Sequence, residues 1–160
     1  MIERLPIDGP VRRAALSDTM KRFSIEYSST WTPGPMSFWV HHHLDGTHWN
    51  NATRFSPPLR GPVAGSGYPT YFVDYRGTRL QFASVDEIRA CIDILGRRVL
   101  PTTFALSAAR GPGLGPNGHW LSRLPAKLKP WRTRQALTAY LRTLLAKHFA
   151  VRAEDHAESA

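Results

Sequence analysis

The sequence predicts one α+β domain, in which a mainly antiparallel sheet over residues 23–84 is packed by a middle helix over 85–95 and a C-terminal helix over 130–149. Three observations support this prediction. Short segments with strand-type alternation, separated by turn sequences, fill the first half of the chain. A capped amphipathic helix follows them, and a longer amphipathic helix begins beside a proline near the end. We therefore expect a sheet followed in sequence by the helices that cover it.

Five strands are expected in the first half, over residues 23–30, 37–44, 47–55, 68–75 and 78–84. Asp45-Gly46 joins the second and third as a two-residue type I′ hairpin. Arg76-Gly77 joins the last two as a second hairpin. The four prolines and three glycines of residues 56–69 indicate a loop between the hairpins.

The middle helix has a start and a stop in the sequence. Ser84 and Glu87 match a capping box, and the acids of the first turn favour the positive helix N-terminus. An apolar stripe with helical spacing follows: Ile88, Cys91, Ile92 and Leu95. Gly96 is expected to end the helix as its C′ residue.

The last third of the chain is predicted to be helical with proline- and glycine-rich breaks. A short helix is expected over 101–109, a loop over 111–118, one or two turns over 119–124, and a long helix with Pro130 at its first position. Its expected apolar face comprises Leu137, Tyr140, Leu141, Leu144, Leu145 and His148. Arg134, Arg142 and Lys147 are expected to point toward solvent.

Length and composition favour one domain over residues 20–150, with a loose N-terminal extension over 1–19 and a flexible tail over 151–160. A chain of 160 residues with 42% hydrophobic residues is long and apolar enough to bury a core. The single cysteine, Cys91, cannot form an internal disulfide and favours a reducing cytoplasm. No apolar run approaches the roughly 20 residues that span a bilayer, and the N-terminus lacks the apolar core of a secretory signal.

Charge is segregated along the chain. The formal net charge is +9, yet residues 94–153 contain no Asp or Glu. This stretch holds eleven cations: Arg97, Arg98, Arg110, Arg123, Lys127, Lys129, Arg132, Arg134, Arg142, Lys147 and Arg152. Such a one-signed block attracts polyanions. The alternative is an arginine-rich codon bias that produces a solvated face without a partner.

The segment 119–134 is the first candidate binding surface, because it interleaves five cations with Trp120 and Trp131. Cations neutralise phosphates, and exposed indoles stack on unpaired bases. The residues predicted to bind nucleic acid are Arg110, His119, Trp120, Arg123, Lys127, Lys129, Trp131, Arg132 and Arg134. Two alternatives stay open: the tryptophans anchor the core, and Lys127 and Lys129 form a solvated edge.

The glycine loop 113–118 is a literal G-x-G-x-x-G, but it does not predict a dinucleotide site. No strand precedes it, Pro116 lies inside it, and no acid follows before Glu154. Its backbone N–H groups could approach an anion with help from Arg110 and His119. The alternative is a structural connection.

The histidines around Asp45-Gly46 suggest a metal site. In the expected hairpin His43 faces His48, and His41 shares the face of His43, so the three could hold a divalent metal such as zinc. Asp45, Glu26 or Asp74 could add a carboxylate. The alternative is a polar hairpin face, and a His48–His119 acid–base pair is a further hypothesis.

The leading functional hypothesis is a non-catalytic, cofactor-free accessory or regulatory protein of a bacterial cytoplasm that binds DNA or RNA through its basic C-terminal surface. A small metal- or histidine-dependent hydrolase or nuclease is the first alternative. An interaction module for an acidic protein is the second. Membrane binding is not expected, because the apolar face of the C-terminal helix is typical of a core stripe. A helix-turn-helix over 85–110 would need an unusually long linker at 96–101.

Overall fold

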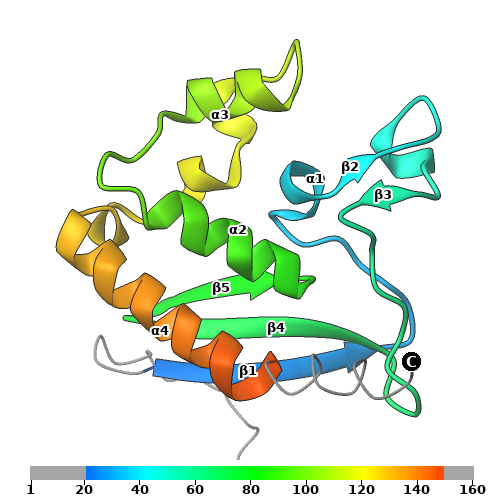
Figure 1. Cartoon of the computed structure of the whole chain (residues 1–160), viewed down its shortest axis with the longest axis horizontal. Helices are drawn as coiled ribbons and strands as arrows, with labels where there is room; N and C mark the ends of the chain where they lie inside the picture. The colour runs from blue at the N-terminus through cyan, green and yellow to red at the C-terminus, as the bar shows by residue number, and fades with distance from the viewer. Residues whose placement is uncertain (1–20, 150–160) are drawn as a thin grey trace, which may run out of the picture.

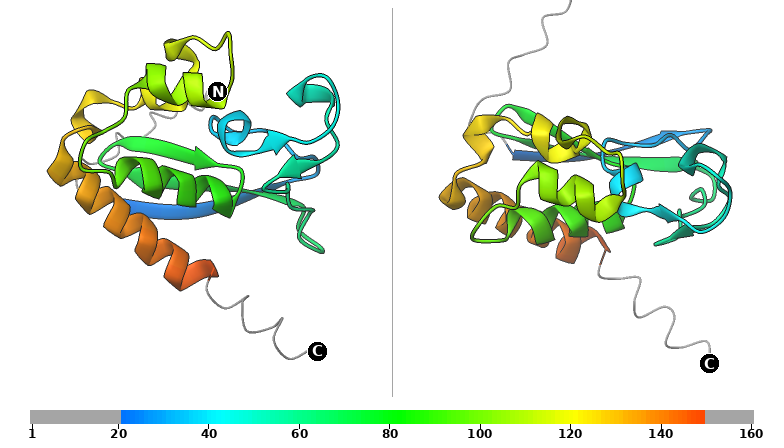
Figure 2. Two further views of the ribbon diagram at one scale, coloured as in Figure 1. Left: turned by 45° about the horizontal axis from the view of Figure 1, so that its top comes forward. Right: turned by 90° about the horizontal axis from the view of Figure 1, so that it is seen from above.

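The computed structural model describes residues 21–149 and has two layers, a sheet and the helices that cover it (Figures 1 and 2). The strands β1 (Lys21–Ser28), β4 (Tyr68–Tyr75) and β5 (Thr78–Phe82) form an antiparallel sheet in the order β1-β4-β5. The helices α2 (Val85–Leu95) and α4 (Trp131–Phe149) lie across one face of this sheet (Figure 1). The predicted α+β class is therefore confirmed.

The core lies between the sheet and these two helices. The buried sheet residues alternate along β4 and β5: Tyr71, Val73, Tyr75, Leu80 and Phe82. The helices contribute Ile88, Cys91, Ile92, Leu95, Leu137, Leu141 and Leu144 at helical spacing. Burial of these two periodic faces against each other supplies the main favourable term in folding.

The hairpin between β4 and β5 forms as predicted. Tyr75 pairs with Thr78, so the turn consists of Arg76 and Gly77. Both turn residues have positive φ, 48° for Arg76 and 78° for Gly77, as a type I′ turn requires. This turn places Arg76 at the end of the sheet.

The predicted hairpin around Asp45-Gly46 is wrong. Residues Ser37–Val40 form a helical turn, α1, and only His42–His43 (β2) and Phe55–Ser56 (β3) pair as short strands. The Asp45 carboxylate accepts hydrogen bonds from the N–H groups of Thr53 and Arg54 and from the Thr53 hydroxyl. These bonds close a wide loop that includes the 3₁₀ turn η1 (Trp49–Asn51), in place of a two-residue turn.

Helix α2 begins and ends at the predicted residues. The Ser84 hydroxyl accepts from the N–H of Glu87, while the Glu87 carboxylate reaches Ala83 N–H (3.2 Å) instead of Ser84 N–H. Gly96 ends the helix with φ −78°, so it is not in the left-handed C′ conformation that we expected. Glycine is needed there for space, because a Cβ would lie 2.7 Å from the Ile92 carbonyl oxygen.

The remaining elements follow the predicted order. They are α3 (Thr103–Arg110), the 3₁₀ turns η2 (Pro116–Gly118), η3 (Trp120–Arg123) and η4 (Ala126–Leu128), and then α4. The extension predicted for residues 1–19 and the tail predicted for 151–160 lie outside the described residues. Within the described part of the chain, none of the helices is long and apolar enough to cross a membrane.

The buried face of α4 differs from the prediction at both ends. Leu137, Leu141 and Leu144 are buried as expected, but His148 is exposed and Arg134 is buried. Arg134 lies on the same helical stripe, one turn before Leu137, and its guanidinium finds carbonyl partners inside the fold. The expectation that Arg134 points toward solvent is therefore wrong.

Candidate nucleic-acid interface

Arg134 joins α2 to α4. Its Nη1 donates to the carbonyls of Leu95 (3.1 Å) and Arg97, and its Nη2 donates to that of Arg98 (3.1 Å). Its Nε donates to the carbonyl of Lys129 (2.7 Å). The guanidinium thus satisfies carbonyls at and beyond the C-terminus of α2, where a cation is favoured. With 4% of its surface exposed, Arg134 has a structural role and is not available to a phosphate.

His119 and Trp120 are also part of the core. His119 Nδ1 accepts from the N–H of Leu121 (3.1 Å), and its ring packs against Trp39 and Trp120, with centroids 4.6 and 5.3 Å away. Burial lowers the pKa of His119 to about 4, so its imidazole is neutral at neutral pH. The position and low basicity of His119 give no support to a His48–His119 acid–base pair.

His119 predicts a loss of stability in acid. Its pKa is depressed in the folded protein, so protons bind the unfolded chain more tightly and stability falls as the pH drops from about 6.5 toward 4. We expect the free energy of unfolding to fall by about 3 kcal/mol over this pH range because of His119. His119→Asn retains a capping oxygen. This variant should have a lower free energy of unfolding, but that free energy should fall less as the pH drops. Urea unfolding at a series of pH values measures both effects. An unchanged fall in the variant would contradict this assignment.

Arg110 packs on its neighbours from α3. Its Nε donates to the Phe38 carbonyl (2.9 Å), and its guanidinium lies 4.2 Å from the centroid of the Phe38 ring. Burial lowers the pKa of Arg110. Among the described residues, no hydrogen bond, ion pair or ring contact joins Arg110 to the other predicted cations.

The other predicted cations are exposed or half-buried: Arg123, Lys127, Lys129 and Arg132. The last three lie at one end of the molecule, which we call the basic end and define as Lys21, Arg76, Arg97, Arg98, Lys127, Lys129 and Arg132. In Figure 1 the start of β1, the β4–β5 turn, the C-terminus of α2 and the start of α4 all lie at this end. Four parts of the chain that are distant in sequence, at residues 21, 76, 97–98 and 127–132, therefore contribute cations to it.

Contacts between these segments establish the basic end. Lys127 Nζ donates to the Arg76 carbonyl (2.6 Å), which joins η4 to the β4–β5 turn. The Lys21 ammonium lies 5.7 and 5.6 Å from the ring centroids of Tyr75 and Tyr140, which joins β1 to α4. The Arg98 guanidinium lies 5.3 Å from the centroid of Trp131. The half-buried Trp131 thus provides an aromatic surface among the cations.

Few acids offset this charge. Residues 21–149 contain seventeen Lys and Arg against six Asp and Glu. In the basic end Asp93 pairs with Arg97 (2.9 Å) through exposed side chains. Asp74, in the neighbouring part of β4, is bound by Arg79 (2.8 Å), whose guanidinium lowers the pKa of that carboxyl. The basic end therefore keeps a strongly positive potential.

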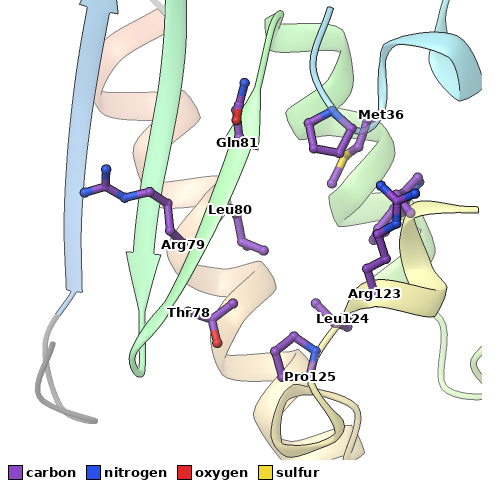
Figure 3. A pocket seen from close by; sticks show the side chains of 10 residues that line it. Met36, Thr78, Arg79, Leu80, Gln81, Arg123, Leu124 and Pro125 are labelled. Carbon is purple, nitrogen blue, oxygen red and sulfur yellow. The ribbon is translucent and has the colours of Figure 1, made fainter. Parts of the chain in front are cut away.

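A pocket of about 140 Å³ opens beside the basic end (Figure 3). It lies between the edge strand β5 and the segment 120–125, and its lining includes Met36, Leu80, Trp120, Arg123, Leu124 and Pro125. Figure 3 shows Arg123 beside Met36, whereas Arg79 extends away from the pocket across β4. Exposed Arg123 thus belongs to this pocket.

The predicted metal site does not form. His41 is buried and bonded on both ring nitrogens, His43 is paired with Phe55 in β2–β3, and exposed His48 caps η1. Among residues 21–149, no three His, Cys, Asp or Glu side chains are placed to hold a metal ion. The prediction was wrong because it depended on the tight hairpin.

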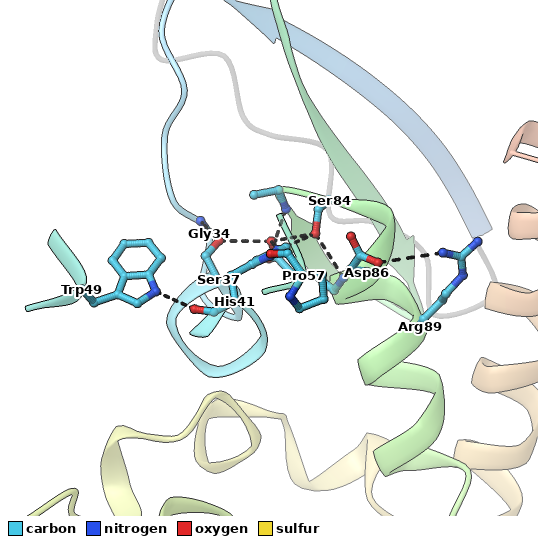
Figure 4. Close-up of polar contacts among 10 residues, drawn as sticks. Gly34, Ser37, His41, Trp49, Pro57, Ser84, Asp86 and Arg89 are labelled. Atoms are coloured by element: carbon cyan, nitrogen blue, oxygen red, sulfur yellow. Dashed lines mark hydrogen bonds and ion pairs between the residues drawn. The ribbon is translucent and has the colours of Figure 1, made fainter. Parts of the chain in front are cut away.

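His41 belongs instead to a buried polar network (Figure 4). Its Nδ1–H donates to the Pro57 carbonyl (2.7 Å), and its Nε2 lies 2.9 Å from the Ser84 hydroxyl and 3.4 Å from the Glu87 carboxylate. Burial alone lowers the pKa of His41, but the bonds to Glu87 and Pro57 outweigh it and raise the pKa above 6.5. With His41 and Glu87 fully buried, this network links α1 and the Pro57 loop to α2 and is closed to a substrate.

Sequence reasoning missed Lys21, Arg76, Arg97 and Arg98 as members of the site. The last two were within the acid-free block, and Arg76 was in a predicted turn. Lys21 could be assigned to this end only from the pairing of β1 with β4, which places Lys21 opposite Tyr75. Comparisons with protein-family models, with curated proteins and with solved structures found no match.

Proposed function

We propose that the protein is a non-catalytic nucleic-acid-binding accessory or regulatory protein whose basic end holds the phosphate backbone. The observation that carries this proposal is the gathering of seven cations from four distant parts of the chain at one end of the molecule, with one ion-paired acid among them. Exposed cations release counterions when they neutralise phosphates, and this release favours binding at low salt. The half-buried rings of Trp131 and Tyr140 add aromatic surface on which bases can stack.

The proposed partner is DNA or RNA with exposed phosphates, and little direct reading of base sequence is expected. Size, basicity and the single cysteine fit a bacterial cytoplasm, which we propose as the compartment. Cys91 is buried, and burial raises the pKa of its thiol to about 12, so it is unreactive there. An acidic protein that occupies the same cations would be revealed by the test below.

Neutralising part of the basic end should weaken binding selectively. The test variant is Arg76→Asn, Lys129→Gln and Arg132→Gln, in which asparagine suits the positive φ of the turn. We expect its affinity for labelled single-stranded DNA or RNA at low salt to fall at least about tenfold, because three phosphate contacts are lost. Fluorescence anisotropy with single-stranded DNA, double-stranded DNA and RNA measures the effect.

The matched control carries the same change in charge elsewhere: Arg54→Gln, Arg60→Gln and Lys147→Gln. Arg54 lies in the β2–β3 loop, at the end opposite the β4–β5 turn in Figure 1. Arg60 is exposed between β3 and β4, and Lys147 lies in the last turn of α4. This variant should bind within about twofold of the parent protein. Equal losses in the two variants, or no binding of any probe at low salt, would refute the proposal. A nuclease-resistant acidic protein partner, with no probe bound, would favour an interaction module.

A further inference from the structure

We propose that the pocket between β5 and the segment 120–125 receives one unpaired pyrimidine base of the strand whose phosphates lie on the basic end. This inference rests on the proposed function and adds the class of base and its position. Four kinds of observation support it: the size of the pocket, its apolar walls, the open edge of β5, and the cations around its mouth.

The volume of the pocket fits a single six-membered ring. At about 140 Å³ it is smaller than the roughly 300–1,000 Å³ pockets that hold drug-sized ligands. It is close to the ~150 Å³ apolar cavity that holds a benzene ring in another protein. A pyrimidine is a ring of this size, whereas the two fused rings of a purine are too large.

The walls present apolar surface to the faces of a ring. Met36 and Trp120 are almost fully buried, with 3% and 6% of their surfaces exposed, so they form a rigid wall. Leu80 and Leu124 lie on opposite sides of the pocket in Figure 3, one on β5 and one after η3. Thioether, aromatic and aliphatic groups of this kind pack well on the π faces of a base.

The edge of β5 supplies polar groups that match the rim of a pyrimidine. This strand is at the edge of the sheet, so it pairs with β4 on one side only. In an antiparallel pair the N–H and C=O of every second residue face away from the partner strand. Counted from the Tyr75–Thr78 pair that closes the turn, these residues are Arg79 and Gln81, and both line the pocket. A backbone N–H and C=O complement the carbonyl and N3–H of thymine or uracil.

The position of the pocket suits a nucleotide more than an isolated ring. Thr78 and Pro125 line it, and they lie within two residues of Arg76 and Lys127 of the basic end. Lys127 Nζ donates to the Arg76 carbonyl (2.6 Å), so these cations border the same end of the pocket. Arg123 is exposed on another side. A base in the pocket therefore has cations near the phosphates on either side of it.

An extended peptide that adds to β5 as a further strand is the rival occupant. A peptide needs a continuous open groove along the strand. Here the segment that contains Trp120, Leu124 and Pro125 stands across from β5 and closes the space to the volume of one ring. These observations favour a base over a strand.

The test compares three strands of equal length and charge: oligo(dT), oligo(dA), and a strand with abasic spacers. We expect oligo(dT) to bind the full chain about tenfold more tightly than the abasic strand. Thr78→Phe, which fills the pocket from the strand, should reduce oligo(dT) to the affinity of the abasic strand. Thr78→Val, which has nearly the same size and leaves the pocket open, should keep the preference.

A measurement on the unaltered protein covers the case in which Thr78→Phe does not fold. With ¹³C-methyl methionine, oligo(dT) should shift the Met36 methyl signal, and the abasic strand should leave it in place. Equal binding of the abasic and thymine strands overturns the pocket inference while the proposed function stands. Equal preference for oligo(dA), or displacement of oligo(dT) by an uncharged extended peptide, also overturns it. If no strand binds at low salt, both proposals fail.

Discussion

Replacing Glu87 with alanine should lower the free energy of unfolding by about 3–5 kcal/mol, the usual cost of removing one partner from a buried ion pair. The Glu87 carboxylate is fully buried and accepts hydrogen bonds from the hydroxyls of Ser37 and Ser84 (3.1 Å each) and from Ala83 N–H. Alanine leaves these donors and His41 without their acceptor. Urea unfolding at neutral pH measures the loss.

The same network gives stability a dependence on pH that the variant should lack. The pKa of His41 is raised in the folded protein, so its contribution is fully present below about 6.5, its unfolded value. That contribution is lost as the pH rises through the higher folded value. We expect the parent protein to lose stability on this alkaline side and Glu87→Ala to show a flatter profile. Asp86→Ala, a neighbouring half-buried acid with an ion pair of 3.9 Å to Arg89, is the control and should cost less than about 1 kcal/mol. A similar loss in both variants would contradict the assigned role of Glu87.

Arg134→Leu should destabilise the protein by about 3 kcal/mol, because it removes charged donors from carbonyls that are partly inside the fold. Leucine keeps the apolar stem on the buried stripe of α4, so the loss reports the guanidinium. Arg132→Leu is the matched control, on the same helix but exposed, and should change stability by less than about 0.5 kcal/mol. Thermal and urea unfolding provide the comparison.

The two arginines should show the opposite order in binding. Arg132→Leu should weaken binding to a single strand, whereas Arg134→Leu should retain binding at a temperature where it is folded. Arg132 is an exposed member of the basic end, whereas the guanidinium of Arg134 already donates hydrogen bonds to four backbone carbonyls. If the Arg134 variant were as stable as its parent and bound more weakly, Arg134 would belong to the interface and our structural assignment would be wrong.

Elements that depend on neighbouring residues could be predicted from the sequence. Alternation along β4 and β5, the turn at Arg76-Gly77 and the Ser84 cap of α2 are local features, and the structure confirms all three. The Asp45-Gly46 turn is also local, but the Asp45 carboxylate bonds to Thr53 and Arg54, eight and nine residues away. Asp-Gly favours a tight turn, but the hydrogen bonds of the Asp45 side chain stabilise a wider loop, and these bonds exist only once the loop has folded.

Roles that depend on distant partners could not be predicted. Arg134 has the helical spacing of the buried leucines of α4, but an arginine is buried only where it finds partners, and the carbonyls that bind it lie 36–39 residues earlier. Glu87 matched a capping residue, but its bond to Ser37 spans 50 residues. The acid-free block indicated a positive surface, yet the basic end needed Lys21 and Arg76 from outside that block, brought in by strand pairing.

The salt dependence of binding tests the central proposal most directly. For single strands the logarithm of the association constant falls with the logarithm of salt concentration, with a slope of about −0.7 for each phosphate neutralised. We predict that the variant Arg76→Asn, Lys129→Gln, Arg132→Gln has a slope about 2 units shallower than the parent protein, because three phosphate contacts are missing. The control variant Arg54→Gln, Arg60→Gln, Lys147→Gln should keep the parent slope. Equal slopes for the parent protein and the basic-end variant would contradict the proposal that this surface holds the phosphate backbone.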